Sequence, residues 1–238
     1  MATAEDVRAA LAEVADPADA LFLQRFFKTA PGEYGEGDVF IGVRVPATRA
    51  VVKRFTGLPP TGLDYDEIDA LLDSPVHEHR LAGALLLVRR YKKDPEAVYD
   101  RYLAAVRRGR INNWDLVDAS SEFIVGEHLA DRDRALLDEL AASGSLWERR
   151  VAVLATFQFI KKGDPSTTFA LAERLLSDPE DLIHKSTGWM LREIGKRVSR
   201  EQLTGFLDAR AAAMPRTMLS YATEHLDPAE RAKYRSMR

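Results

Sequence analysis

The sequence predicts an all-α fold, a helical-repeat α-solenoid, and three observations lead to this prediction. Apolar residues recur at three- and four-residue spacings along most of the 238 residues, as they do in helices that bury one face. Acidic residues followed by proline recur at the expected helix starts, where a capping side chain and a fixed φ favour the first turn. The sequence contains no convincing alternating strand pattern or hairpin dipeptide, so no sheet is predicted.

The predicted helices follow this periodicity in chain order. They span Ala4–Val14, Ala18–Lys28, Asp66–Leu72, Glu78–Lys92, Glu96–Arg107, Trp114–Leu129, Arg132–Leu140, Trp147–Ile160, Ser166–Leu176, Asp181–Arg197, Glu201–Ala213 and Arg216–His225. The acid–proline pairs that mark boundaries are Asp16-Pro17, Asp94-Pro95, Asp164-Pro165, Asp178-Pro179 and Asp227-Pro228. Residues 30–46, rich in glycine, break the pattern. A loop of this length in a helical protein is either functional or unusually well packed.

A repeat of 35 residues connects the stronger helices. Starting at Arg80, this step leads to Asp115, Arg150, Lys185 and Ser220, each early in a predicted helix. Two places further on stands a small or β-branched residue in every case: Ala82, Val117, Ala152, Thr187 and Ala222. With another helix between them, each unit is a helix pair, as in HEAT and TPR repeats. Because the TPR aromatic and proline pattern is absent, we predict a HEAT-like solenoid with a concave face, forming a single domain over residues 1–238.

Composition excludes several classes of chemistry. The chain is 46% hydrophobic and 30% charged, an ordinary balance for a folded domain, and it has no cysteine, which excludes disulfides, thiolate catalysis and cysteine zinc sites. His77 and His79 are two residues apart rather than the four that one helical face requires, so we predict no metal site and no cofactor. The N-terminus is acidic and no apolar run is long enough to span a bilayer, so we expect a cytoplasmic protein without a membrane partner.

Charge is distributed unevenly along the chain. The net charge is −3, but residues 142–238 contain 16 Lys and Arg against 12 Asp and Glu, whereas residues 1–141 contain 18 against 25. The second half therefore has the residues for a basic surface despite the acidic total.

The 35-residue register also places four polar or aromatic side chains on one helical face. Measured from the start of each repeat helix, Trp114, Asp118, Arg150 and Trp189 lie at about 0°, 40°, 100° and 140° on a helical wheel. Structural roles are the alternative: a tryptophan in a helix is usually a core residue, Asp118 could be a capping or solvated acid, and Arg150 could form an ion pair with Asp115 or Asp118. Asn112 and Asn113 fit a cap before Trp114.

Several motifs resemble the DNA alkylation repair enzymes of the AlkD type. They are WDLVD at 114–118, WERRVAVLATFQFIKKGD at 147–164 and KSTGWMLREIGK at 185–196. The segments FFKTAPGEYGEGDVFIGVRVPATR at 26–49 and MPRTMLSYATEHL at 214–226 are similar to that family too. The match covers nearly the whole chain with the motifs in order, and it accounts for the glycine-rich segment.

The resemblance implies a HEAT-like DNA glycosylase that excises cationic alkylpurines such as 3-methyladenine and 7-methylguanine, without flipping the base, in base excision repair. In that family two tryptophans and an aspartate contact the sugar of the damaged nucleotide and an arginine supports the site. By motif, these roles fall on Trp114, Trp189, Asp118 and Arg150, with Arg149 as the fallback arginine. We expect the concave face to bind double-stranded DNA containing alkylated purines, the protein to be a monomer, and the bound protein to be associated with the nucleoid.

Basic residues of the second half are the expected phosphate contacts. These are Lys161, Lys162, Arg192, Lys196, Arg197 and Arg216. Ser220 stands where the late motif of the family would have another basic residue. The competing interpretation is a non-catalytic HEAT-like scaffold that binds DNA or protein, in which Asp118 would be dispensable.

Overall fold

The protein is helical, as the sequence predicts. The computed structural model describes residues 2–58 and 62–237, and among them it has no strand, only an isolated parallel bridge between Val39 and Val76. Its contacts divide the chain into two compact units, and the boundary in the sequence falls between Ser120 and Ser121. No described helix combines the length and apolar character needed to cross a lipid bilayer. The prediction of an all-α helical-repeat fold is confirmed, whereas the single domain and the concave face stay predictions.

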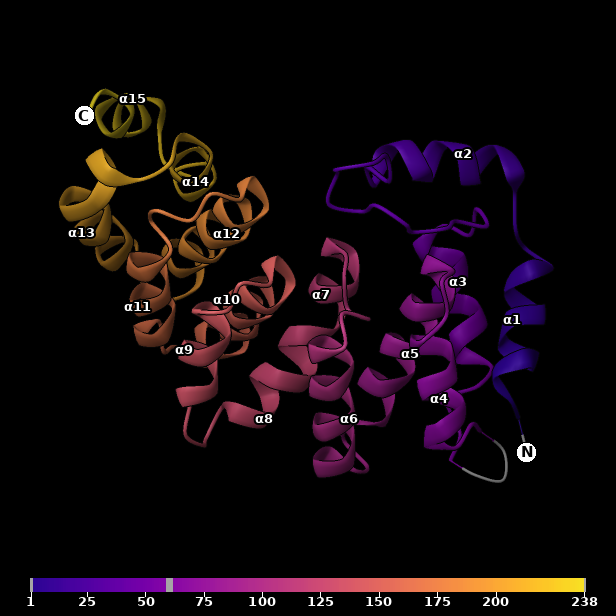
Figure 1. Cartoon of the computed structure of the whole chain (residues 1–238). Helices are drawn as coiled ribbons and strands as arrows, with labels where there is room; N and C mark the ends of the chain where they lie inside the picture. The colour runs from indigo at the N-terminus through magenta and orange to yellow at the C-terminus, as the bar shows by residue number, and fades with distance from the viewer. Residues whose placement is uncertain (1, 59–61, 238) are drawn as a thin grey trace. The chain divides into compact units, whose positions relative to one another are not determined.

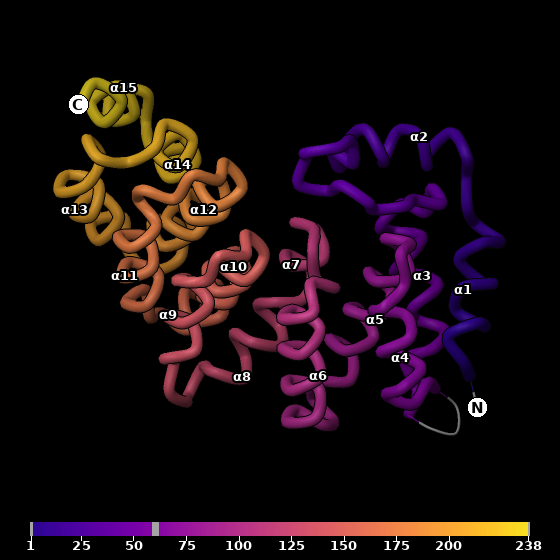
Figure 2. The backbone as a smooth tube through the Cα atoms, viewed as in Figure 1, coloured from indigo at the N-terminus to yellow at the C-terminus, as the bar shows by residue number. Residues whose placement is uncertain are grey.

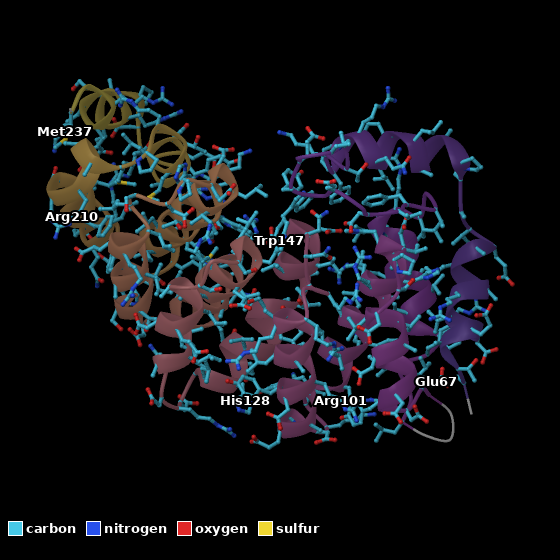
Figure 3. All side chains as sticks on the ribbon, viewed as in Figure 1. Glu67, Arg101, His128, Trp147, Arg210 and Met237 are labelled. Atoms are coloured by element: carbon cyan, nitrogen blue, oxygen red, sulfur yellow. The ribbon has the colours of Figure 1, made fainter. Side chains whose placement is uncertain are left out.

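The first unit is built around a central helix, α5. Its helices are α1 (Ala4–Ala12), α2 (Pro17–Phe26), α3 (Val45–Lys53), α4 (Tyr65–Leu72), α5 (His77–Arg90), α6 (Pro95–Arg107) and α7 (Trp114–Ser121). Figure 1 shows α1 running beside α3 and α4, with α2 lying across one end of this group. Most of α5 is buried, so this helix forms the core of the unit. Glu67 of α4, labelled in Figure 3, accepts a hydrogen bond from the N–H of Ala4 at 2.6 Å and ties α1 to this group.

The second unit stacks helix pairs. It contains the π-helical turn η1 (Glu122–Gly126), α8 (Glu127–Leu129), α9 (Ala135–Ala141), α10 (Leu146–Lys161), α11 (Ser166–Arg174), α12 (Asp181–Arg197), α13 (Arg200–Arg210), the 3-10 turn η2 (Ala211–Ala213), α14 (Arg216–Ala222) and α15 (Pro228–Ser236). Helices α10, α12 and α14 follow one another as neighbours, with α12 packed against both others. Helices α9, α11 and α13 line the other side of this row (Figure 2).

The 35-residue repeat corresponds to real helices. Its five positions fall in α5, α7, α10, α12 and α14. The small or β-branched residues two places on, Ala82, Val117, Ala152, Thr187 and Ala222, are each at most 1% exposed. A small side chain at these positions lets neighbouring helices approach closely, which is why the residue type recurs with the repeat.

Two helices were not predicted, and one predicted helix is more complex than expected. Helix α3 begins inside the glycine-rich segment 30–46, which was expected to break the helical pattern, and α15 is mostly polar and buries only Tyr234. The predicted helix 114–129 is α7, η1 and α8 in direct succession. Of the acid–proline pairs, Asp16 and Asp227 cap helices with their side chains. Asp94 instead accepts a hydrogen bond from the hydroxyl of Tyr65 at 2.7 Å.

Gly188 lets α12 and α14 approach closely. A methyl group at this position would overlap the carbonyl oxygen of Met218, and it would lie 2.7 Å from Cβ of Tyr221. We expect Gly188→Ala to lower the free energy of unfolding by about 1–3 kcal/mol, because the helices must move apart to admit the methyl group. Urea unfolding would measure this. Gly205→Ala in α13 is the control, since its methyl group would meet open space; equal stability of the two variants would contradict the prediction.

Candidate functional site

The first turns of helix α7 carry two of the predicted site residues. Trp114 is its first residue, and the side-chain oxygen of Asn113 accepts a hydrogen bond from the Trp114 N–H at 2.9 Å. Asp118 lies one turn later, and both side chains are half-buried. Residues four apart lie above one another on a helix, so the indole and the carboxylate share one face of α7. This part of the predicted constellation follows from the local structure of the helix.

The Trp114 indole packs against aromatic rings from the end of α2 and the loop that follows. It stacks on Phe27 at 5.0 Å between ring centroids and 12° between planes, and Phe26 meets it edge-on at 6.0 Å. Phe27 also stacks on Phe40, 5.0 Å away. Phe27 and Phe40 are buried, whereas Phe26 is 53% exposed. Trp114 is therefore neither a core tryptophan nor a freely exposed one: one ring face is held by Phe27.

A buried cluster of charges lies beside this aromatic group. The Asp38 carboxylate accepts hydrogen bonds from Arg80 at 2.5 Å and from Nδ2 of Asn113 at 3.1 Å. The His77 ring lies between two carboxylates, with Nδ1 3.1 Å from Asp38 and Nε2 2.9 Å from Asp115. Each of these residues is at most 7% exposed. The cluster connects the loop after α2, the first turn of α5 and the first residues of α7.

The two carboxylates keep His77 protonated. Burial alone would lower the pKa of His77, but the charges and hydrogen bonds of Asp115 and Asp38 outweigh it and raise the pKa to about 9. Burial would raise the pKa of Asp38, but His77, Arg80 and Asn113 reverse this effect and lower it. Protonated His77 and Arg80 thus balance the two carboxylates, as a buried cluster requires.

The raised pKa of His77 makes the protein less stable in alkali. Both the folded and the unfolded chain hold this proton below pH 6.5, whereas between 6.5 and about 9 only the folded chain retains it. Stability from this group is therefore complete below pH 6.5 and is lost as the pH rises through 9, by about 3 kcal/mol in all. Urea unfolding at pH 6.5 and 9.5 would measure the loss. It should be absent in His77→Gln, and an equal alkaline loss in that variant would contradict the assignment.

The second half of the glycine-rich loop is well packed, one of the two roles that its length allowed. The Glu78 carboxylate, 1% exposed, accepts hydrogen bonds from the N–H groups of Ile41, Gly42 and Val43 at 2.8–3.2 Å. Gly42 has a φ of 88°, and a side chain there would overlap the carbonyl oxygen of Asp16. The loop is thereby fixed above the first turn of α5, where it supplies Asp38 and Phe40.

The two arginines of the second unit have different surroundings. Arg149 binds the Asp178 carboxylate with Nε at 2.7 Å and the carbonyl oxygen of Ser143 at 3.0 Å, so it holds the start of α10 to the segment before α12. Arg150 is 4% exposed and donates to the carbonyl oxygen of Leu182 at 2.5 Å. Both side chains therefore have structural partners within the unit, and the choice of Arg150 over Arg149 stays a prediction.

Trp189 on α12 is held by a buried glutamate. Its Nε1 donates to Glu193 at 3.3 Å, and its ring lies 5.9 Å from that of Phe157 on α10. Glu193 is 4% exposed; burial would raise the pKa of its carboxyl, but Arg197 and Arg192 outweigh this effect and lower it. The half-buried indole is thus fixed by a carboxylate that two cations keep ionised.

Most of the predicted phosphate contacts have partners inside the protein. Lys161 binds Glu122, Lys162 binds Asp131 at 3.3 Å, Arg192 binds Glu224, Arg197 binds Glu193 at 2.6 Å, and Arg216 donates to the carbonyl oxygen of Arg235 at 2.9 Å. Within residues 2–58 and 62–237, Lys196 has no such partner. It lines a cavity of about 230 Å³ with Arg192, Arg200 and His225. The pair of Lys162 with Asp131 is exposed and contributes roughly 0–1 kcal/mol, so it leaves Lys162 available to phosphate. Lys161 and Arg197 instead pair with the buried carboxylates of Glu122 and Glu193.

Sequence reasoning missed the residues that hold the predicted site residues in place. These are Asp38, His77, Glu78, Arg80 and Asp115 around α7, and Glu193 beside Trp189. His77 was considered only as a metal ligand, and Asp115 only as a partner of Arg150. The available signal was a histidine and a glutamate, adjacent in sequence at the start of a helix with the apolar run LAGALLLV, because polar groups buried beside such a run need partners.

Comparisons with known proteins agree with the resemblance. The family model described as DNA alkylation repair enzyme matches residues 7–226. A solved structure described as a predicted DNA alkylation repair enzyme from Enterococcus faecalis has a TM-score of 0.71 and 19% sequence identity, and the match covers 90% of this chain and 97% of that one. At this identity the likeness supports the fold alone. No curated protein matches the chain. Because the family model spans most of the sequence, the chain belongs to the DNA alkylation repair enzyme family, whose role is the repair of alkylation damage in DNA.

Proposed function

We propose that the protein is a DNA glycosylase, which hydrolyses the N-glycosidic bond of cationic alkylated purines in duplex DNA without flipping the base. The substrates are of the 3-methyladenine and 7-methylguanine type, and the product enters base excision repair. The observation that carries this proposal is the pairing of Trp114 and Asp118 on one face of α7, in a member of a DNA alkylation repair family.

The chemistry matches these two residue types. An N3- or N7-alkylated purine already bears a positive charge, so it leaves with the electron pair of the glycosidic bond and needs no general acid. Positive charge then develops on the deoxyribose, where the Asp118 carboxylate stabilises it and orients the attacking water. Water forms the new bond to C1′ of the sugar, and its proton passes to the carboxylate or to solvent. The face of the Trp114 ring opposite Phe27 would offer negative potential to the cationic sugar, an interaction of roughly 0.5–2 kcal/mol.

The remaining residues keep the roles that the resemblance implies. Trp189, held by Glu193 at 3.3 Å, contacts the sugar, and Arg150 supports the site. Lys161, Lys162, Arg192, Lys196, Arg197 and Arg216 contact phosphates. Contacts of this kind bind the DNA backbone whatever its sequence, and the affinity decreases as the salt concentration rises. The protein acts as a monomer on double-stranded DNA.

The test is release of free bases from duplex DNA treated with a methylating agent, measured by chromatography. The protein should release 7-methylguanine and 3-methyladenine, but neither hypoxanthine nor uracil from duplexes that contain those neutral lesions, because no general acid is assigned. Binding of the methylated duplex without any base release would favour the non-catalytic scaffold. Release of the neutral bases would contradict the mechanism, since such a base leaves only when it is protonated or when its anion is stabilised, and no residue is assigned either role.

A further inference from the structure

The buried charges beside α7 have no role in the proposed reaction, yet they bind the side chains of the residues directly before and after Trp114. Asn113, just before Trp114, donates to Asp38 at 3.1 Å, and Asp115, just after it, binds His77 at 2.9 Å. Asp38 and His77 are themselves 3.1 Å apart. A closed chain of contacts therefore runs from one neighbour of Trp114 through the loop and α5 to the other neighbour.

We propose that His77, held between Asp38 and Asp115, is a positioning residue that fixes the first turn of α7 and so sets the orientation of Trp114 and Asp118. This inference rests on the proposed function, because it concerns the same two side chains. His77 is 1% exposed, so it touches no substrate and acts only through α7 and the rings around Trp114.

His77 reaches Trp114 by two routes. The first is the backbone, through Asp115, and Asp118 follows within one turn of the same helix. The second is the aromatic group: the His77 ring lies 5.0 Å from Phe27, which stacks on the Trp114 indole at 5.0 Å. Phe40 also stacks on the His77 ring, 4.4 Å away, and on Phe27. A change at His77 therefore affects both the backbone that carries the indole and the ring that supports it.

The charges of the cluster explain why the position requires histidine. The charged groups that face His77 are Asp38 from the loop and Asp115 from α7, while Arg80 binds the far oxygen of Asp38. Protonated His77 donates to both carboxylates at once and leaves the cluster neutral. Packed apolar residues often stabilise a core as well as such charges do. The charged arrangement instead fixes a single geometry, because any displacement of the first turn of α7 would leave a buried charge without its partner.

The experiment compares His77→Gln with a matched control, His79→Gln. Both histidines belong to α5, but His79 is only half-buried and its Nδ1 lies 2.9 Å from the hydroxyl of Ser74, away from α7. We expect His77→Gln to lower the single-turnover rate of 7-methylguanine release by roughly tenfold or more, as loss of supporting hydrogen bonds does at other sites. The dissociation constant for methylated duplex should be unchanged. His79→Gln should match the wild type in both.

A spectroscopic measurement separates positioning from stability and from the proposed function. In full-length protein carrying Trp147→Phe and Trp189→Phe, Trp114 is the remaining tryptophan. Addition of His77→Gln should increase acrylamide quenching of its fluorescence at a temperature where the protein is folded, and addition of His79→Gln should not.

Each outcome then has one meaning. A wild-type rate in folded His77→Gln, or a lower rate with unchanged Trp114 quenching, overturns the positioning role. If the wild type releases no base, the proposed function fails, and the quenching comparison alone decides the positioning role. Should His77→Gln not fold, Asp38→Asn takes its place with the same expectations, because it keeps the shape of the side chain and removes one charge from the cluster.

Discussion

Replacing Asp118 by asparagine is expected to lower the single-turnover rate of 7-methylguanine release by about 100-fold or more. Asparagine keeps the size of the side chain but removes the negative charge that stabilises the developing sugar cation. The alkylpurine remains a good leaving group without the enzyme, so the charge on the sugar is the part of the transition state that the protein can stabilise. The loss should therefore appear in the rate of the chemical step and not in the affinity for DNA.

The control for this prediction is Asp100→Asn. Asp100 is an exposed carboxylate on α6 in the same unit, so its substitution changes the net charge by the same amount without touching α7. Its rate and DNA affinity should equal those of the wild type. Equal rates for Asp118→Asn and the wild type, with both proteins folded, would show that the carboxylate has no part in the mechanism. Asp118 would then be a capping or solvated acid, the structural alternative.

Replacing Glu78 by alanine is expected to lower the free energy of unfolding by about 3–5 kcal/mol. Glu78 is 1% exposed, and its carboxylate accepts hydrogen bonds from the N–H groups of Ile41, Gly42 and Val43. Alanine would leave these donors without an acceptor beneath the loop, where water has little access. The loop should detach from α5, taking Asp38 and Phe40 with it.

Urea unfolding followed by circular dichroism measures this loss, and proteolysis within residues 30–46 reports the state of the loop. Glu78→Gln is the matched variant: it retains one acceptor oxygen, so its loss should be clearly smaller than that of alanine. A decrease below about 1 kcal/mol for Glu78→Ala, the size of an ordinary surface change, would show that the loop is held by its apolar contacts instead.

The parts of the site that could be predicted are those set by local periodicity. Trp114 and Asp118 share a face because they are four residues apart on one helix, and the 35-residue step locates α5, α7, α10, α12 and α14 because each helix repeats the same packing. The failures have local causes as well. Helix α15 is mostly polar and buries only Tyr234, so few apolar residues mark it in the sequence.

Local sequence patterns were sufficient to predict the helical repeat, the small residues at its contacts and the helical face that Trp114 and Asp118 share. Which buried charges pair could not be predicted in this way: His77 binds the carboxylates of Asp38 and Asp115, which are 39 and 38 positions away in the sequence. The physical reason is that helix formation depends on residues within a turn or two of each other. The partner of a buried charge depends instead on which distant segment folds against it, and a carboxylate looks the same in sequence whether it is solvated, paired or catalytic.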